Sequence, residues 1–454
     1  MEETGWGHSP FHGLKETLFS FPTGPNYEYL NDCNTTGKIF DIMWSGISSH
    51  ILDYTLSREM EMECNINDIN LLLASQLVMG LTPQPSIVDY FKHDDTGIFG
   101  SLWMQQHFTR EKWKYLNSNI HFQPRVTIQM LRSNVQMLWN LDQILIVDEM
   151  MVPFTGRWKW IQFVKGKPHD TGLKFYGLTD FNFYLWDFWL YEGSESERSG
   201  KPTDIVMDFA TNVTKIQHKP HIIVADSYYG SLNLAQQLHN MKLGCLFSCR
   251  ADKPTDLFTG YLHNGLTKGN FNHINNRTFS AITYYDKAKV NLLTNVFLGN
   301  RMIYDSTKQK SLPISLYWYR KWLGGLDHFD RWLHLYLKPH RNIKWTQALL
   351  PALLKIAVGN TNIIANRMEL SENLKDTTLQ LIQHLTSNHT LRTNENRPIY
   401  QIKKTGWGHF PEEISKKRPC AHCLSLKVKS STTFKCQICD VALHPKCFKN
   451  YHES

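Results

Sequence analysis

The chain has 454 residues, of which 42% are hydrophobic and 20% are charged, and it includes 14 Trp and 24 Phe. This composition excludes an intrinsically disordered protein and predicts about two to four folded domains. The longest apolar stretch, 348–358, contains Pro351 and Lys355. The N-terminal sequence has no basic segment followed by an apolar one, so we expect neither a membrane span nor a signal peptide.

Charge and cysteine are both concentrated near the C-terminus. The formal net charge is +8, and residues 401–454 carry ten Lys or Arg against four Asp or Glu. A basic tail favours an anionic partner, with nucleic acid first, although a merely solvated tail has the same composition. Five of the nine cysteines fall between Cys420 and Cys447. This clustering is typical of a metal site in a reduced compartment rather than of a disulfide framework.

The composition and apolar spacing of the N-terminal half of the chain change twice. Residues 1–38 are rich in Gly, Pro, Asn and Thr and predict an irregular leader. Residues 39–139 are expected to be helical, because segments such as INLLLASQLVMGL have apolar residues three and four apart. From 140 to 250, short apolar runs such as QILIVDEMMVPF and HIIVADSYYG alternate with helix-like stretches. That pattern predicts an α/β core with buried strands.

The C-terminal half continues this alternation. Residues 251–318 are more polar, show little clear period and predict an insertion domain. Helical spacing returns within 319–338 and 339–386. A basic linker is expected over 387–417, followed by a cysteine-rich domain over 418–454.

Three aspartates occupy positions that suit a metal site. Asp148 follows the residues ILIV and Asp226 follows IIVA, so each is expected at the end of a buried strand, on the rim of a sheet. Asp327 lies in GGLDHFDRW, whose apolar spacing predicts a helix, and Asp330 lies three residues further on the same helix face. Carboxylates suit Mg²⁺, and two ions roughly 3.5–4 Å apart stabilise the attacking and leaving oxygens of a phosphoryl displacement. The alternative is that each strand-end aspartate caps a turn or a helix.

The sequence around these aspartates resembles the piggyBac transposase family. The segment VDEMMVPFTGRWKWIQFVKGKPHDTGLKFYGL resembles the family's first aspartate block, ADSYYGS its second and GGLDHFDRW its third. The resemblance implies an RNase H-like catalytic core with an insertion domain, flanked by helical dimerisation and DNA-binding segments. It also implies that Asp148, Asp226 and Asp327 bind Mg²⁺ or Mn²⁺ as the catalytic triad, with Asp330 as an accessory acid.

Basic and aromatic residues near these blocks are candidates for DNA contact. A basic run after the first strand can neutralise phosphates, although a solvated loop is the alternative. By resemblance, Trp345 in IKWTQAL matches an aromatic position that acts on a DNA hairpin, and its alternative is a core tryptophan. The residues of the basic run are Arg157, Lys159, Lys165 and Lys167.

The chain departs from the family pattern at three positions. Leu326 replaces the more usual Val, Arg320 stands where Asn is frequent, and Arg331 where Gln is common. These departures bear on the fine geometry of the site and not on the acids expected to bind metal.

The cysteine-rich tail predicts zinc from its spacing. Two Cys-x2-Cys pairs and a His-x2-Cys pair let thiolates and imidazoles reach tetrahedral zinc, whereas free thiols need no such spacing. The family resemblance implies a cross-brace-type zinc finger with two ions. An eighth ligand is not evident, so His422, a terminal carboxylate or water is a candidate, or the second site is weak. The first expected ligand set is Cys420, Cys423, His444 and Cys447, and the second is Cys436, Cys439 and His452.

The favoured interpretation is a nuclear DNA transposase. By resemblance it cuts double-stranded DNA at transposon terminal repeats, forms a hairpin, integrates at TTAA and works as a homodimer. The second interpretation is a domesticated descendant that binds DNA or chromatin without transposing. The third takes the tail as a RING- or PHD-like interaction module, with the spacing of the aspartates accidental.

Overall fold

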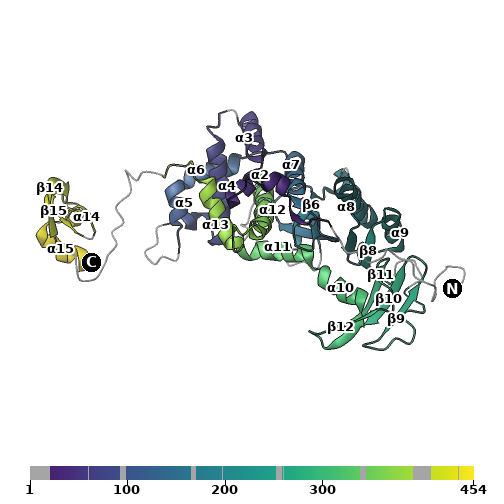
Figure 1. The fold of residues 1–454 in the computed structure, drawn as a ribbon. Helices are drawn as coiled ribbons and strands as arrows, with labels where there is room; N and C mark the ends of the chain where they lie inside the picture. The colour runs from purple at the N-terminus through teal and green to yellow at the C-terminus, as the bar shows by residue number, and fades with distance from the viewer. Residues whose placement is uncertain are drawn as a thin grey trace. The chain divides into compact units, whose positions relative to one another are not determined.

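The computed structural model divides the chain into two compact units, one up to Thr390 and one from Leu391 (Figure 1). Each unit is described by itself. The residues described are 21–59, 61–92, 99–164, 170–196, 198–251, 258, 260–337, 344–391, 411–437 and 439–453.

The helical part of the first unit is assembled from two separate stretches of sequence. Helices before the sheet pack against helices that follow it: α12 contacts α2 and α7, and α13 contacts α2 and α4. The expected helical spacing is confirmed, but the leader predicted as irregular already contains α1 and the start of α2. The helices are α1 (Tyr27–Leu30), α2 (Thr36–Met43), α3 (Ile47–Arg58), α4 (Ile66–Leu81), α5 (Leu102–His107), α6 (Arg110–Asn119), α7 (Pro124–Met137), α12 (Trp345–Arg367) and α13 (Leu374–Leu385).

Local sequence fixes several of these helix ends. The Asn65 side chain accepts a hydrogen bond from the backbone N–H of Asp68, whose carboxylate accepts one in return from the Asn65 N–H. This reciprocal capping satisfies two N–H groups that the first turn of α4 leaves without helical partners.

Among the described residues, α12 is the one helix long and apolar enough to cross a membrane by length and composition. However, 78% of its most apolar window is buried inside the protein. That burial is typical of a core helix, so the apolar stretch is accounted for by packing.

A nine-stranded sheet forms the centre of the first unit. Its strand order is β4-β5-β3-β7-β8-β11-β10-β9, with β6 also paired to β5. β3, β7 and β8 are mutually parallel, and the remaining pairs are antiparallel. The strands are β3 (Ile144–Pro153), β4 (Ile161–Phe163), β5 (Thr171–Asp180), β6 (Leu185–Leu190), β7 (Ile222–Ala225), β8 (Gly244–Ser248), β9 (Phe271–Asn275), β10 (Ser280–Tyr285) and β11 (Lys289–Thr294).

The two faces of this sheet bury different cores, because successive side chains of a strand point to opposite faces. In β3, Leu145 and Val147 join the large core shared with the helices. Ile144 and Ile146 join a second core that α10 (Ile314–Trp322) covers. The apolar runs of 140–250 are therefore buried strands, as the sequence predicts.

The segment 251–318, expected as an insertion domain, adds strands to the same sheet. β11 pairs antiparallel with β8, and β10 and β9 follow outward from it. A separate two-stranded hairpin comprises β12 (Met302–Asp305) and β13 (Lys310–Pro313). The helix α8 (Pro202–Gln217) connects β6 to β7, and α9 (Leu232–Asn240) connects the parallel strands β7 and β8. The helix α11 (Gly325–Tyr336) follows α10.

The second unit is a small domain with its own core. β14 pairs antiparallel with β15, and Val441, Leu443, Phe448 and Tyr451 pack among the cysteines. Its elements are β14 (Pro411–Pro419), α14 (Ala421–Ser425), β15 (Ser431–Cys436), the short 3₁₀ helix η4 (Pro445–Cys447) and α15 (Phe448–Glu453).

Candidate functional site

Asp148 and Asp226 lie side by side where two parallel strands part. The ladder between β3 and β7 runs from Ile144 opposite Ile222 to Val147 opposite Ala225. Asp148 follows Val147 within β3, and Asp226 follows the last residue of β7, so the two aspartates come next to each other in this register.

The expectation that Asp148 ends its strand is wrong. β3 continues to Pro153 because residues 149–153 keep pairing with β5, and Asp148 itself lies opposite Gly177. Only Asp226 lies at a strand end, since β7 stops at Ala225. One carboxylate therefore belongs to a continuous strand and the other to a turn.

The carboxylates of this pair are held in a buried, acidic environment. Asp148 is buried and accepts a hydrogen bond from the Glu149 N–H at 2.8 Å, and Asp226 accepts one from the Tyr228 N–H at 2.9 Å. Burial raises the pKa of Asp226, the Tyr228 N–H opposes that shift, and the nearby Glu149 charge adds to it. A raised carboxyl pKa beside other acids is the electrostatic situation that a divalent cation relieves.

Two tyrosines that sequence reasoning missed surround this acidic pair. Tyr319 of α10 donates a hydrogen bond to Ser248 of β8 at 2.8 Å. Burial raises its pKa, the hydrogen bond to Ser248 opposes that shift, and the charges of Asp226 and Asp148 add to it. Tyr229 donates to the Glu149 carboxylate at 3.1 Å. The sequence offered one signal: Tyr229 lies within the block ADSYYGS, and Tyr319 lies five residues before GGLDHFDRW.

The helix α11 brings Asp327 to the same region. Its first residue, Gly325, lies against the sheet, since a Cβ atom there would be 3.2 Å from Cδ1 of Ile146. The next residue, Leu326, contacts Gly177, which is the strand partner of Asp148. Asp327 follows in the first turn of the helix and is exposed.

The three aspartates do not form a closed ligand set in this structure. In the part of the chain that is described, the groups of three or more residues whose ligand atoms all lie within 4.8 Å of one another consist of cysteine and histidine. Asp330, expected as an accessory acid, contacts His334 at 3.1 Å one turn further along α11.

A cavity of about 50 Å³ lies between β3, α11 and α12. Asp330, His334 and Lys355 line it together with apolar residues such as Met151 and Pro351. The hydrogen bond that His334 donates to the Asp330 carboxylate raises the pKa of His334. Burial lowers the pKa of Lys355 to about 8, against the opposing charge of Asp330. Three titratable groups, Asp330, His334 and Lys355, thus line the same small cavity.

Trp345 begins α12 and belongs to an aromatic cluster. Its ring stacks on Trp158 at 4.8 Å between centroids and 21°, and Trp158 lies 4.6 Å from Trp160. Phe122 meets Trp345 edge-on at 5.4 Å. Trp345 and Trp158 are both only partly buried. Both rings pack against the large core, which the alternative of a core tryptophan also predicts.

The basic run after the first strand is only partly described. Arg157 is exposed. Lys159 lies 2.5 Å from the Glu195 carboxylate and 5.6 Å above the Trp160 ring, so its charge already has a partner within the chain. Lys165 and Lys167 lie outside the described residues.

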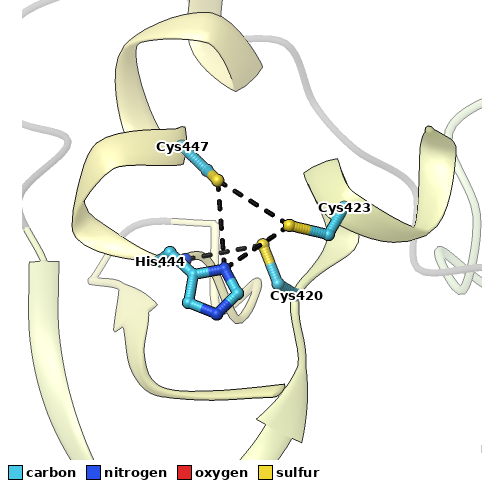
Figure 2. A group of neighbouring side chains, drawn as sticks. All are labelled: Cys420, Cys423, His444 and Cys447. Carbon is cyan, nitrogen blue, oxygen red and sulfur yellow. Dashed lines mark hydrogen bonds between the residues drawn. The ribbon is translucent and has the colours of Figure 1, made fainter. Parts of the chain in front are cut away.

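Four side chains of the second unit converge on one point (Figure 2). Nδ1 of His444 is 3.5 Å from Sγ of Cys423 and 3.9 Å from Sγ of Cys447, and the two sulfurs are 3.9 Å apart. Tetrahedral zinc with ordinary Zn–S and Zn–N bonds requires about 3.5–3.8 Å between such atoms. Together with Cys420, these residues fit one zinc ion.

Hydrogen bonds around this group prepare its ligands for a cation. Nε2 of His444 is 3.2 Å from the Ser431 carbonyl oxygen, which can accept its proton and leave Nδ1 free to bind metal. Burial raises the pKa of the Cys420 thiol, but the backbone N–H groups of Cys423 and His444 outweigh burial and lower it to about 7. A thiol of this kind readily becomes the thiolate that zinc binds.

A second group contains Cys436, Cys439 and His452. Nε2 of His452 is 3.7 Å from Sγ of Cys439, and its Nδ1 is 2.7 Å from the Phe448 carbonyl oxygen. The imidazole is thus oriented as in the first group, with one nitrogen towards the cysteines. The group has three ligands among the described residues, and His422 belongs to neither group.

Comparisons with known proteins agree on one family. The sequence profile described as Transposase IS4 matches residues 38–362. The chain is 24% identical over 332 residues to the human PiggyBac transposable element-derived protein 3, covering 67% of this chain and 54% of that protein. A human Chimeric ERCC6-PGBD3 protein matches at the same identity over 30% of its length. The chain therefore spans about half, or less, of these curated relatives.

One solved structure supports the same fold. The cryo-EM structure of the piggyBac transposase synaptic complex with hairpin DNA superposes with a TM-score of 0.73, covering 94% of this chain and 98% of that one. Sequence identity in this comparison is 16%, so it establishes a shared fold and nothing finer.

Proposed function

Because the chain belongs to the Transposase IS4 family and shares the fold of piggyBac transposase, we propose that it is a piggyBac-like DNA transposase. The reaction proposed is metal-dependent cleavage of phosphodiester bonds and strand transfer at TTAA sites. The observation that carries the proposal is the pairing of Asp148 and Asp226 at the end of the parallel ladder, with the first turn of α11 packed beside it.

We interpret the sheet as an RNase H-like core. Support comes from the order β6-β5-β3-β7-β8, in which three antiparallel strands are followed by two parallel strands reached through α8 and α9. Ligands of such open sheets bind outside the carboxyl ends of the parallel strands. Asp226 follows the carboxyl end of β7, which is where this rule expects them.

In the proposed mechanism Asp148, Asp226 and Asp327 hold Mg²⁺ or Mn²⁺. The bound ions supply charge stabilisation for the attacking and leaving oxygens. The chain itself contributes orientation: the sheet fixes Asp148, the Tyr228 N–H fixes the Asp226 carboxylate, and packing of α11 fixes the level of Asp327. Burial beside Tyr319 and Tyr229 lowers the local dielectric, which strengthens these interactions.

The second unit is proposed to bind zinc and to recognise DNA at the transposon terminal repeats. The first group has four ligands with separations that suit zinc, and the second has three. Their basic surroundings, ten basic residues against four acidic ones over 401–454, favour contact with phosphates. Two DNA ends must be cut together, so we further propose a homodimer that acts in the nucleus.

A second function has a specific observation in its favour. The curated relatives include human proteins described as transposable element-derived, or as a chimera containing one. A domesticated DNA- or chromatin-binding protein without transposition is therefore the alternative. The RING- or PHD-like interpretation does not account for the match over 38–362, which lies wholly outside the tail.

A cleavage assay with matched variants separates these functions. The zinc-loaded full chain is incubated with Mg²⁺ and DNA that carries candidate terminal repeats, beside Asp226→Asn and the surface control Asp53→Asn. Cleavage by the wild type and Asp53→Asn, but not by Asp226→Asn, supports the transposase. Tight, zinc-dependent DNA binding with no cleavage by any variant favours the domesticated binder.

A further inference from the structure

A cluster of positive charge surrounds Asp286, far in sequence from the basic tail. Arg320 of α10 lies 2.6 Å from the Asp286 carboxylate, which belongs to the turn between β10 and β11. This hydrogen bond, with the charges of Lys310 and Lys308, holds the pKa of Asp286 below its ordinary value. Three cations from the β12–β13 hairpin and α10 thus converge on a single acid.

Tyr284 anchors two of these cations. Nζ of Lys310 donates a hydrogen bond to the Tyr284 hydroxyl at 3.2 Å and lies 5.6 Å from the ring centroid. The Arg320 guanidinium lies 5.8 Å from the same centroid. Because Tyr284 is buried, it holds the side chains of Lys310 and Arg320 in place. Lys308 is exposed.

The positive charge of this region exceeds what its own acids can neutralise. Residues 286–321 contain seven Lys or Arg and two Asp, which gives seven minus two, or +5. The second acid, Asp305, is buried and accepts hydrogen bonds from the backbone N–H groups of Thr307 and Lys308. Nη1 of Arg320 is buried and has no hydrogen-bond partner within the part of the chain that is described. Such a cluster attracts an external anion.

The cluster adjoins the candidate catalytic acids through consecutive residues of one helix. Tyr319 donates its hydrogen bond to Ser248, which follows Phe247, the β8 partner of Ala225, and so reaches the level of Asp226. The next residue, Arg320, contacts Asp286. α10 contacts β11, β12 and β13, and it leads directly into α11 (Figure 1). The first turn of α11 carries Asp327. An anion bound at the cluster therefore lies next to the helix that carries the third aspartate.

We propose that Lys308, Lys310 and Arg320, hereafter the Asp286 cluster, bind the phosphate backbone of duplex DNA beside the point of cleavage. This inference rests on the proposed function and extends it to a surface outside the catalytic acids and the tail. An arginine fork and two ammonium groups suit phosphate oxygens, and backbone contacts set the position of DNA without reading its sequence.

The test measures how salt weakens DNA binding. Affinity of the zinc-loaded full chain for a random duplex of about 30 base pairs is measured by fluorescence anisotropy from about 50 to 300 mM KCl. The variant Lys308→Gln/Lys310→Gln is compared with wild type and with Lys201→Gln/Lys215→Gln, which removes two exposed lysines of α8 and its start. Each lost phosphate contact lowers the slope of log affinity against log salt by about 0.9.

We expect the slope to fall by about 2 in the cluster variant and to stay unchanged in the α8 control. An unchanged slope in the cluster variant, with wild-type DNA binding intact, overturns the inference but leaves the proposed function standing. Absence of salt-dependent binding by the wild type overturns both.

A second variant tests the cluster in the opposite direction. Asp286→Asn removes the acid and frees Arg320, so DNA affinity should rise by a factor of about 3 to 10 at low salt. If Asp286 served only to hold α10 in place, the variant would bind DNA no more tightly than wild type, and that result contradicts the inference. This arm remains informative even if the lysine variant fails to fold.

Discussion

Gly325 of α11 and Thr179 of β5 are so close that a Cβ atom on the glycine would lie 2.8 Å from the threonine Oγ1. Thr179 is fully buried, so it cannot move aside easily. Gly325→Ala should therefore push the start of α11 off the sheet and lower the free energy of unfolding by about 1–3 kcal/mol. Because Asp327 is two residues away, cleavage should fall by about 10²-fold. Chemical denaturation and a cleavage assay measure the two effects.

Gly324→Ala is the matched control. A Cβ atom at Gly324 would meet nothing within 4 Å, and the residue has an ordinary negative φ. It should leave stability and cleavage near wild-type values. Equal effects of the two substitutions would show that glycine flexibility, rather than the close approach to Thr179, explains the first result.

Zinc should leave the second unit in two steps. The Cys420 group has four ligands and the Cys436 group has three among the described residues, so a chelator should remove the second ion first. Cys439→Ser should abolish the early step and Cys423→Ser the late one, while Cys64→Ser should change neither. Zinc release is followed with a colorimetric chelator, and a single step in the wild type would contradict the expectation.

The stack of Trp158 on Trp345 should matter for one stage of the reaction only. If Trp345 acts on a DNA hairpin, loss of its stacking partner should slow hairpin processing about tenfold, since an aromatic pair contributes roughly 0.5–1.5 kcal/mol. Trp158→Phe should retain most of the hairpin-processing activity because it keeps an aromatic ring, and Trp158→Ala should lose it. Initial nicking, resolved on the same gel, serves as the internal control. The Trp158→Ala/Trp345→Ala double variant should be no slower than Trp345→Ala alone, because the two side chains act as a unit.

Lys355 should make stability rise with pH. Its pKa falls from 10.5 to about 8 on burial in the cavity. Between those values the unfolded chain binds more protons than the folded chain, so stability increases with pH across that window. The variant Lys355→Met should lack this rise of stability with pH, because methionine does not titrate. The stability of wild type relative to the variant should therefore improve by about 1–3 kcal/mol from pH 7.5 to 10. Thermal unfolding at both pH values measures this, and parallel pH curves would exclude it.

The fold could be predicted where hydrophobic burial dominates the sequence. The runs before Asp148 and Asp226 became the paired strands β3 and β7 because β-strands buried on both faces need continuous apolar residues. The ligand groupings of the tail also match the sets expected from the family resemblance, since short Cys-x2-Cys spacings leave the chain few alternatives.

Other features depend on contacts that no local pattern encodes. The strands of 251–318 carry polar residues such as Asn272 and Asn291, so their periodicity is weak, yet they extend the central sheet. Asp148 was expected at a strand end because the aliphatic run stops there, whereas pairing with β5 carries the strand five residues further. Tyr319 reaches the acids only through the packing of α10 on the sheet, which sequence spacing does not reveal.

The strands β3 and β7 separate after Val147 and Ala225. The backbone amides near the two acids should therefore exchange with deuterium at different rates. The backbone at Asp148 is enclosed in a ladder with β5, whereas Asp226 starts a turn closed by its own carbonyl oxygen, which accepts from the N–H groups of Tyr229 and Gly230. Short turns open at lower free energy than central strands. Deuterium should enter residues 227–230 well before 147–150. If the pair holds metal as proposed, Asp148 would be the rigidly held ligand and Asp226 the more adjustable one.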